Sequence, residues 1–156
     1  MKTINLTQGK VALVDDEDFE ELNKYKWFAF KNGNTFYALR SAKTINKKRK
    51  VIYMHRVLAN TPDGMNTDHK DRDGLNNQKS NLRACTYAEN CRNKLKAPNN
   101  TSGYKGVHFH KASQKWTAYL RVDKKAISFG YFDSKEMAHQ AYVEGVKKHH
   151  KEFANY

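Results

Sequence analysis

The chain has 156 residues, which is enough for one ordinary domain or two small ones. It carries 29 lysines and arginines against 16 acidic residues, and the net charge of +13 lies entirely beyond residue 42, because residues 1–42 hold six side chains of each sign. This excess indicates a polyanionic partner such as nucleic acid, although charge alone suits a ribosome-associated or merely basic protein equally well.

The sequence contains no apolar run of the length that a membrane span needs, and its N-terminus lacks the apolar core of a signal peptide. Its two cysteines, Cys85 and Cys91, are not spaced as in paired zinc ligands, and a single disulfide between them would stabilise the fold little. We therefore expect free thiols in a soluble, cytoplasmic protein with no membrane partner.

Residues 1–60 predict a β-rich lead-in that ends in a helix. In chain order, the expected elements are a strand at 10–14, a helix capped within 15–18 that runs to residue 22, a β-hairpin at 27–30 and 35–39, a strand at 51–54 and a helix at 55–59. Asn32-Gly33-Asn34 supplies the turn of the hairpin, because these residues tolerate φ > 0. The basic run Lys47–Lys50 is either a solvated turn or a phosphate-contacting loop.

Residues 65–96 predict a strand, a loop, a second strand and a helix. The loop at 71–77 is rich in turn formers, and the second strand is expected at 81–85. Thr86 and Glu89 have the spacing of a capping box, in which each side chain binds the backbone of the other. Asn90 should then lie in the second turn of the helix and face back toward the two strands.

Residues 97–101 are a linker by composition, and 102–156 predict a second domain. Apolar and polar residues alternate over 116–122, which is the pattern of a strand with one buried face, and 126–132 predict another strand. Ser134 should cap a helix whose small and apolar stripe is formed by Met137, Ala138, Ala141, Tyr142 and Gly145. We expect an α+β protein whose C-terminal part is a small antiparallel sheet packed on one helix.

Asp68 and His69 are adjacent, and Asn81 and Asn90 follow His69 by twelve and twenty-one residues. A carboxylate and an amide oxygen suit a hard divalent cation, so Asp68 and Asn90 are candidate ligands of Mg²⁺ or Mn²⁺. Neutral His69 is the candidate general base, and Asn81 the residue that orients its ring. The alternatives are a structural His69 and an Asn81 that caps a turn. Consecutive strand residues also point to opposite faces, so the strand must twist or end for Asp68 and His69 to converge.

The sequence around these residues resembles that of the HNH endonucleases, especially the phage and intron-encoded homing type. The similarity covers residues 54–94 and rests on the segments 65–74, 81–83 and 88–93. It implies a ββα-metal nuclease core behind the β-hairpin lead-in, with domain bounds 1–96, and cleavage of phosphodiester bonds in a phage-infected bacterial host cell. The third catalytic position of this family is often His, whereas here it is Asn90, as in some homing members.

The C-terminal part resembles the DNA-binding domain of plant ethylene-response factors. The similarity lies in five blocks, at 102–107, 115–121, 129–132, 138–142 and 152–154. It implies a three-stranded sheet in the DNA major groove that reads bases with Lys105, His108, His110, Tyr119, Arg121, Ala126 and Ser128. Because lysine and histidine do not reproduce the bidentate contact of arginine to guanine, the GC-rich preference of that family does not carry over.

Three further residues are candidates for the nuclease site or for phosphate contact: His55, Arg83 and Arg92. For His55 a buried structural role is equally consistent with the sequence, and the two arginines also suit a solvated surface. The sequence therefore predicts a monomeric, metal-dependent endonuclease that acts on double-stranded DNA by nicking. The alternatives are a DNA-binding phage regulator with an inactive nuclease core and an RNA-directed nuclease.

Overall fold

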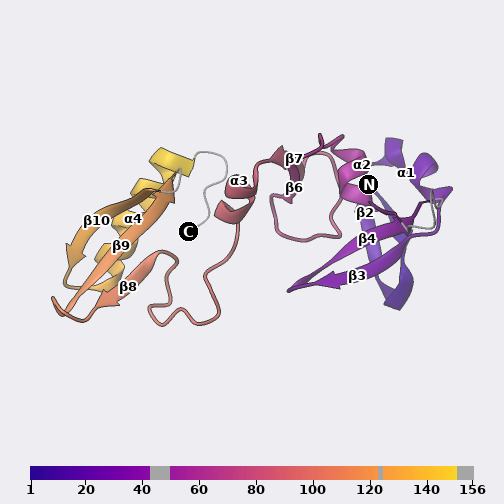
Figure 1. Ribbon diagram of the computed structural model, residues 1–156. Helices are drawn as coiled ribbons and strands as arrows, with labels where there is room; N and C mark the ends of the chain where they lie inside the picture. Colours follow the sequence, from indigo (N-terminus) through magenta and orange to yellow (C-terminus); the bar gives the residue numbers. More distant parts are fainter. Residues whose placement is uncertain (43–49, 123–124, 151–156) are drawn as a thin grey trace. The chain divides into compact units, whose positions relative to one another are not determined.

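The computed structural model describes residues 1–42, 50–122 and 125–150, and the chain divides into two compact units, Met1–Asn90 and Cys91–Tyr156 (Figure 1). Both units combine helices with small antiparallel sheets, which confirms the predicted α+β class. The division falls after Asn90, so the predicted linker at 97–101 lies inside the second unit. Most of the Lys47–Lys50 run and the block at 152–154 fall outside the described residues.

The first unit begins with two small sheets and two helices. Its elements are β1 (Lys2–Asn5), a 3-10 turn (Thr7–Gly9), β2 (Val11–Val14), α1 (Asp16–Asn23), β3 (Phe28–Asn32), β4 (Thr35–Ser41), β5 (Val51–Tyr53) and α2 (Met54–Leu58). Strands β1 and β2 pair with each other, and β3, β4 and β5 form a sheet in that order. The predicted hairpin is confirmed, with Gly33 at φ +60° in its turn.

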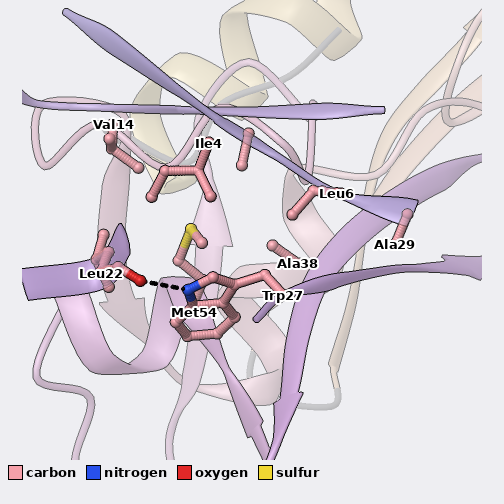
Figure 2. Close-up of a cluster of buried hydrophobic side chains, with 9 residues drawn as sticks. Ile4, Leu6, Val14, Leu22, Trp27, Ala29, Ala38 and Met54 are labelled. Carbon is pink, nitrogen blue, oxygen red and sulfur yellow. Dashed lines mark hydrogen bonds between the residues drawn. The ribbon is translucent and has the colours of Figure 1, made fainter. Parts of the chain in front are cut away.

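The core of the first unit lies between these two sheets and the helices (Figure 2). Met54 and Val14 are fully buried, and the Trp27 indole N–H donates to the Leu22 carbonyl oxygen over 2.8 Å. This bond satisfies the polar atom of an otherwise apolar ring, as burial of tryptophan requires. The packing ties the lead-in together before the chain reaches the candidate site.

The first unit continues with β6 (Asn66–His69), β7 (Leu82–Cys85) and the start of α3 (Tyr87–Arg92), in the predicted order of strand, strand and helix. The last two residues of α3 belong to the second unit. The loop between β6 and β7 is fixed to the lead-in, because Leu13 pairs with Asn76 as an isolated parallel bridge. The loop also approaches β4 closely at Gly74, where a Cβ would lie 2.4 Å from the Phe36 carbonyl oxygen. The lead-in and the loop between β6 and β7 are therefore packed against each other.

Side chains around the ends of α1 and α3 show which capping predictions hold. Thr86 and Glu89 form the predicted capping box, in which the Thr86 N–H donates to Glu89 over 2.8 Å and the Glu89 N–H donates to Thr86 over 3.3 Å. Asp15 precedes α1 but makes no side-chain cap. Its carboxylate instead accepts bonds from Gln78 and from the Lys79 N–H, which again joins the lead-in to the loop before β7.

The second unit is an antiparallel sheet covered by one helix. Its elements are β8 (Val107–His110), β9 (Lys115–Val122), β10 (Lys125–Phe132) and α4 (Lys135–His150), and the strand order is β10-β9-β8. Ser134 caps α4 as predicted, through a bond from the Met137 N–H over 3.1 Å. Gly145 lets the helix approach the sheet, because a Cβ there would lie 2.0 Å from the Phe129 ring. The stripe prediction is wrong for Met137, whose side chain is exposed.

Cys85 and Cys91 are both free thiols, as predicted. Burial raises the pKa of Cys85 to about 11, so its thiol stays protonated near neutral pH. Over the ranges that the structure describes, no helix is both long enough and apolar enough to cross a membrane.

Candidate functional site

Strand β6 carries Asp68 and His69 at its end, and both side chains are buried. Asp68 lies directly opposite Arg83 in the β6–β7 register, and the Arg83 Nε and Nη2 atoms approach the Asp68 Oδ2 atom at 2.8 and 2.7 Å. His69 has different partners, because its ring lies against Tyr37 and His55. The two side chains thus point to different neighbours, as alternation along a strand requires.

The His69 ring makes a long hydrogen bond, from Nε2–H to the Oδ1 atom of Asn77 over 3.4 Å. Donation to an amide oxygen puts the ring proton on Nε2 and leaves the lone pair on Nδ1. Burial lowers the pKa of His69, against this hydrogen bond and three carboxylates that raise it, namely Asp71, Asp68 and Asp73. The ring is therefore neutral at neutral pH, which is the form that accepts a proton from water.

Four rings gather at this end of the first unit: Tyr37, Tyr53, His55 and His69. The His55 and His69 ring centroids are 5.1 Å apart and nearly perpendicular, and Tyr37 packs 5.3 Å from His55 and 5.8 Å from His69. Sequence reasoning named His55 as a candidate but missed Tyr37 and Asn77. Both come from segments outside the quoted motif positions, and only the folding of β4 and the loop against β6 brings them to His69.

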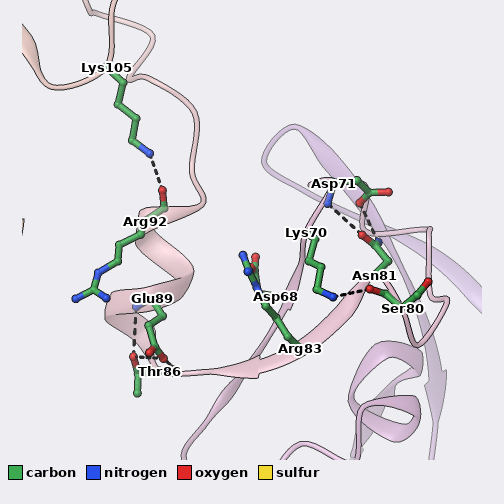
Figure 3. Close-up of polar contacts among 10 residues, drawn as sticks. All are labelled: Asp68, Lys70, Asp71, Ser80, Asn81, Arg83, Thr86, Glu89, Arg92 and Lys105. Carbon is green, nitrogen blue, oxygen red and sulfur yellow. Dashed lines mark hydrogen bonds and ion pairs between the residues drawn. The ribbon is translucent and has the colours of Figure 1, made fainter. Parts of the chain in front are cut away.

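The side chain of Asn81 organises the loop between the two strands (Figure 3). Its Nδ2 atom donates to Asp71 Oδ1 over 2.9 Å and to the Asn76 carbonyl oxygen over 2.8 Å, while its Oδ1 atom accepts from the Asp71 N–H over 3.1 Å. The predicted hold of Asn81 on the His69 ring would therefore act through this loop, because the loop carries Asn77.

Asp68 and Asn90 supply a carboxylate and an amide oxygen, which are hard donors that suit Mg²⁺ or Mn²⁺. Asn90 is half-buried on α3, and its backbone N–H donates to the Thr86 carbonyl oxygen. The Asp68 carboxylate is already paired with the Arg83 guanidinium, so a divalent cation at Asp68 would have to share the carboxylate with that charge. Within the described residues there is no group of three or more His, Cys, Asp or Glu side chains that could hold a metal ion.

His55 is buried in the ring cluster, and its Nδ1 atom has no hydrogen-bond partner. Burial lowers the pKa of His55 from 6.5 to about 3, assisted by His69 and Arg56. A buried polar atom without a partner costs about 1–3 kcal/mol of stability. Because its pKa is lowered to about 3, the His55 ring is neutral near pH 7. Acid should destabilise the fold, because the unfolded chain takes up a proton at His55 that the folded chain does not.

We expect the free energy of unfolding of the first unit to fall as the pH drops from 6.5 toward 3. In this window the unfolded chain binds a proton at His55 that the folded chain excludes, which costs up to about 1.4 kcal/mol per pH unit. Above 6.5 the group is neutral in both states and contributes no pH dependence. Urea denaturation at several pH values, followed by Trp27 fluorescence in a Trp116→Phe background, measures the slope.

His55→Phe should flatten this slope by about one proton, because it removes the titrating ring from the unfolded state as well. His108→Phe is the matched control, since His108 is exposed in the second unit. An unchanged slope in His55→Phe would contradict the assignment of a depressed pKa to this residue.

The outer face of the second unit's sheet gathers most of the predicted base readers. His108 is opposite Thr117 in the strand register, Tyr119 is opposite Ser128, and Arg121 is opposite Ala126; residues opposite one another share a face. The other face is the buried one, with Ala118 and Leu120 in the core. His110 is on the outer face opposite Lys115.

Two pairs of rings stand on this outer face. The ring centroids of His108 and Tyr119 are 5.0 Å apart, and those of His110 and Tyr131 are 5.1 Å apart. Sequence reasoning missed Tyr131, because a register shift between Ser128 and Tyr131 interrupts the alternation along β10. Tyr131 is 55% exposed and extends the face.

Lys105 and Arg92 are not on this sheet. The Lys105 ammonium donates to the carbonyl oxygens of Arg92 and Lys94, at 2.6 Å each, so it covers the end of α3 (Figure 3). A lysine suits this place because the last carbonyls of a helix carry partial negative charge. The predicted role of Lys105 in base reading would require this contact to break.

Comparison with protein-family models, with curated proteins and with solved structures finds no match.

Proposed function

We propose that the protein is a metal-dependent DNA endonuclease of the HNH homing type, which nicks double-stranded DNA. One observation carries the proposal: a neutral, buried His69 next to Asp68, at the end of β6 in a strand–strand–helix segment. Hydrolysis of a phosphodiester uses a neutral base and an oxygen ligand for a cation, and the adjacent His69 and Asp68 offer one of each. The net charge of +13 favours a polyanionic substrate.

Each side chain then has a stated role. His69 accepts the proton of the attacking water at Nδ1, because Nε2–H is engaged by Asn77. Asp68 and Asn90 hold Mg²⁺ or Mn²⁺, which supplies stabilisation of negative charge at the phosphate. Asn81 keeps the loop of Asn77 in place through its three hydrogen bonds. The segment from β6 to α3 would thus be the ββα-metal core, and one such core serves one strand at a time.

The outer face of the second unit is the proposed reader of the DNA duplex. It combines Arg121, a donor for guanine, with histidine, tyrosine and serine side chains that suit other base edges. The two units therefore divide the work between cutting and binding. Double-stranded DNA is favoured over RNA, because the wide major groove of B-DNA admits a sheet and the narrow one of RNA does not.

Variants of the two proposed ligands test the function. Asp68→Asn keeps a hydrogen-bond acceptor for Arg83 but removes the charge that holds a cation, so cleavage of supercoiled plasmid in Mg²⁺ should fall by at least about a hundredfold. Asn90→Ala should also lose cleavage in Mg²⁺, and Mn²⁺ should partly restore it, since Mn²⁺ binds such sites more tightly. The readout is the rate of conversion from supercoiled to nicked plasmid.

Asp63→Ala is the matched control, because Asp63 is an exposed carboxylate in the segment before β6. It should cleave like the parent. Parental rates in both Asp68→Asn and Asn90→Ala would remove the proposed cation site.

A further inference from the structure

The pairing of Arg83 with Asp68 raises a question that the proposed nuclease role leaves open. Both Arg83 donors, Nε and Nη2, approach the same Oδ2 atom of Asp68 across the β6–β7 hairpin. The pair is sheltered from water, since the two side chains are 12% and 5% exposed. The carboxylate that the proposal gives to a divalent cation therefore already has a fixed positive charge on it.

Burial makes this pair matter for ion binding. Charges in a poorly solvated site interact more strongly than at the surface, and a buried carboxylate that loses its partner costs much free energy. A divalent cation arriving at Asp68 meets the Arg83 charge on the same face of the hairpin, because residues opposite each other in an antiparallel pair share a face. The two charges of the cation and the single charge of Arg83 would then share one carboxylate, and this repulsion weakens binding of the divalent cation.

A phosphate group changes the balance. It brings negative charge to the site, and the planar fork of an arginine matches phosphate oxygens as well as it matches a carboxylate. If a backbone phosphate draws Arg83 away from Asp68, the carboxylate becomes available to the cation. Substrate and cation would in this way assist each other.

We propose that Arg83 is the resident counter-ion of Asp68 and competes with the divalent cation for it, so that the cation binds weakly to the protein alone and tightly once DNA phosphate takes over the guanidinium. This inference rests on the proposed nuclease function. It makes Arg83 a positioning residue that couples cation and DNA binding, and by linkage the cation strengthens DNA binding by the same factor. Its effect would be to keep the uncomplexed protein from assembling an active site.

Mn²⁺ binding to the full-length protein, followed by electron paramagnetic resonance of unbound Mn²⁺, tests the competition without reference to cleavage. In the absence of DNA, Arg83→Gln should bind Mn²⁺ about tenfold or more tightly than the parent, because a competing charge is gone. Arg83→Lys keeps that charge and should bind as weakly as the parent. Lys70→Gln is the matched control, since Lys70 is exposed next to His69 and its ammonium binds the Ser80 carbonyl oxygen.

A second measurement uses the parental pair and does not depend on whether Arg83→Gln folds. A short duplex whose phosphates are replaced by phosphorothioates that resist cleavage should tighten Mn²⁺ binding to the Arg83 protein by about tenfold, and by much less in Arg83→Gln. Trp27 fluorescence, measured in a Trp116→Phe background, checks that each variant keeps the core of the first unit.

Three outcomes separate the inference from the function on which it rests. Mn²⁺ that binds tightly in the absence of DNA, equally in the parent and Arg83→Gln, and that is lost in Asp68→Asn, overturns the competition and leaves the nuclease proposal standing. Mn²⁺ binding that Asp68→Asn does not change, with and without DNA, overturns both. Tightening by Arg83→Gln and by DNA, both dependent on Asp68, supports the coupling.

Discussion

His69→Ala should reduce DNA cleavage by about 10²–10⁴-fold, the range that loss of a positioned general base produces. DNA affinity should stay within a few-fold of the parent, because His69 is buried and the binding charge is spread over many lysines and arginines. The measurement is a single-turnover cleavage rate at saturating protein, together with a binding titration on the same duplex.

Asn77→Ala serves as the companion variant, since it removes the partner of the His69 Nε2–H group, together with the Asn77 Nδ2 bond to the Leu75 carbonyl oxygen. We expect it to lower the cleavage rate less than His69→Ala does, because the base remains and only its orientation is loosened. His110→Ala is the matched control on the other unit and should leave the rate at saturating protein unchanged. Parental turnover in His69→Ala would eliminate this residue as the base.

Removing the second unit should abolish most of the DNA affinity. Residues 97–156 contain a core of their own, built by the sheet and α4, so we expect this fragment to fold and to bind DNA alone. Residues 1–96 keep both proposed ligands and the base but lack the outer sheet face, so they should bind DNA weakly and without site preference. Binding titrations of both fragments and the full chain, at two salt concentrations, measure how DNA affinity and site preference are shared between the fragments.

Two point variants refine this experiment. Arg121→Ala should cost about 1–3 kcal/mol at a guanine-containing site and relax the preference there, if its contact is bidentate. Lys111→Ala lies in the exposed turn between β8 and β9 and should weaken binding to all sequences alike, with the salt slope smaller by about one ion. Full affinity and site choice in residues 1–96 alone would contradict the reader role of the second unit.

Local patterns predicted much of the fold. The alternation in 116–122 identified the buried face of β9, and the Thr86–Glu89 spacing identified the start of α3, because each signal depends only on neighbours along the chain. The hairpin turn at Gly33 was predictable for the same reason. The cap expected from Asp15 is absent, because its carboxylate accepts a bond from a distant partner, the backbone N–H of Lys79. A local pattern does not report such a partner.

The candidate site was predictable only in part. Adjacent motif residues such as Asp68 and His69 can be read from the sequence, but their partners cannot, since Asn77, Tyr37 and Arg83 reach them through pairing and packing. The bulge in β10 likewise hid Tyr131, because it changes which residues point outward. The neutrality of His69 is a consequence of burial, which a linear pattern does not report.

Incubation of supercoiled plasmid with the purified full-length protein tests the central claim most directly. With Mg²⁺ or Mn²⁺, we predict time-dependent conversion to nicked circles that excess chelator stops, that His69→Ala does not carry out and that Asp63→Ala carries out at the parental rate. The predicted dependence on both metal and His69 distinguishes this activity from a contaminating nuclease. Conversion that persists in chelator, or that His69→Ala supports at the parental rate, would contradict the account.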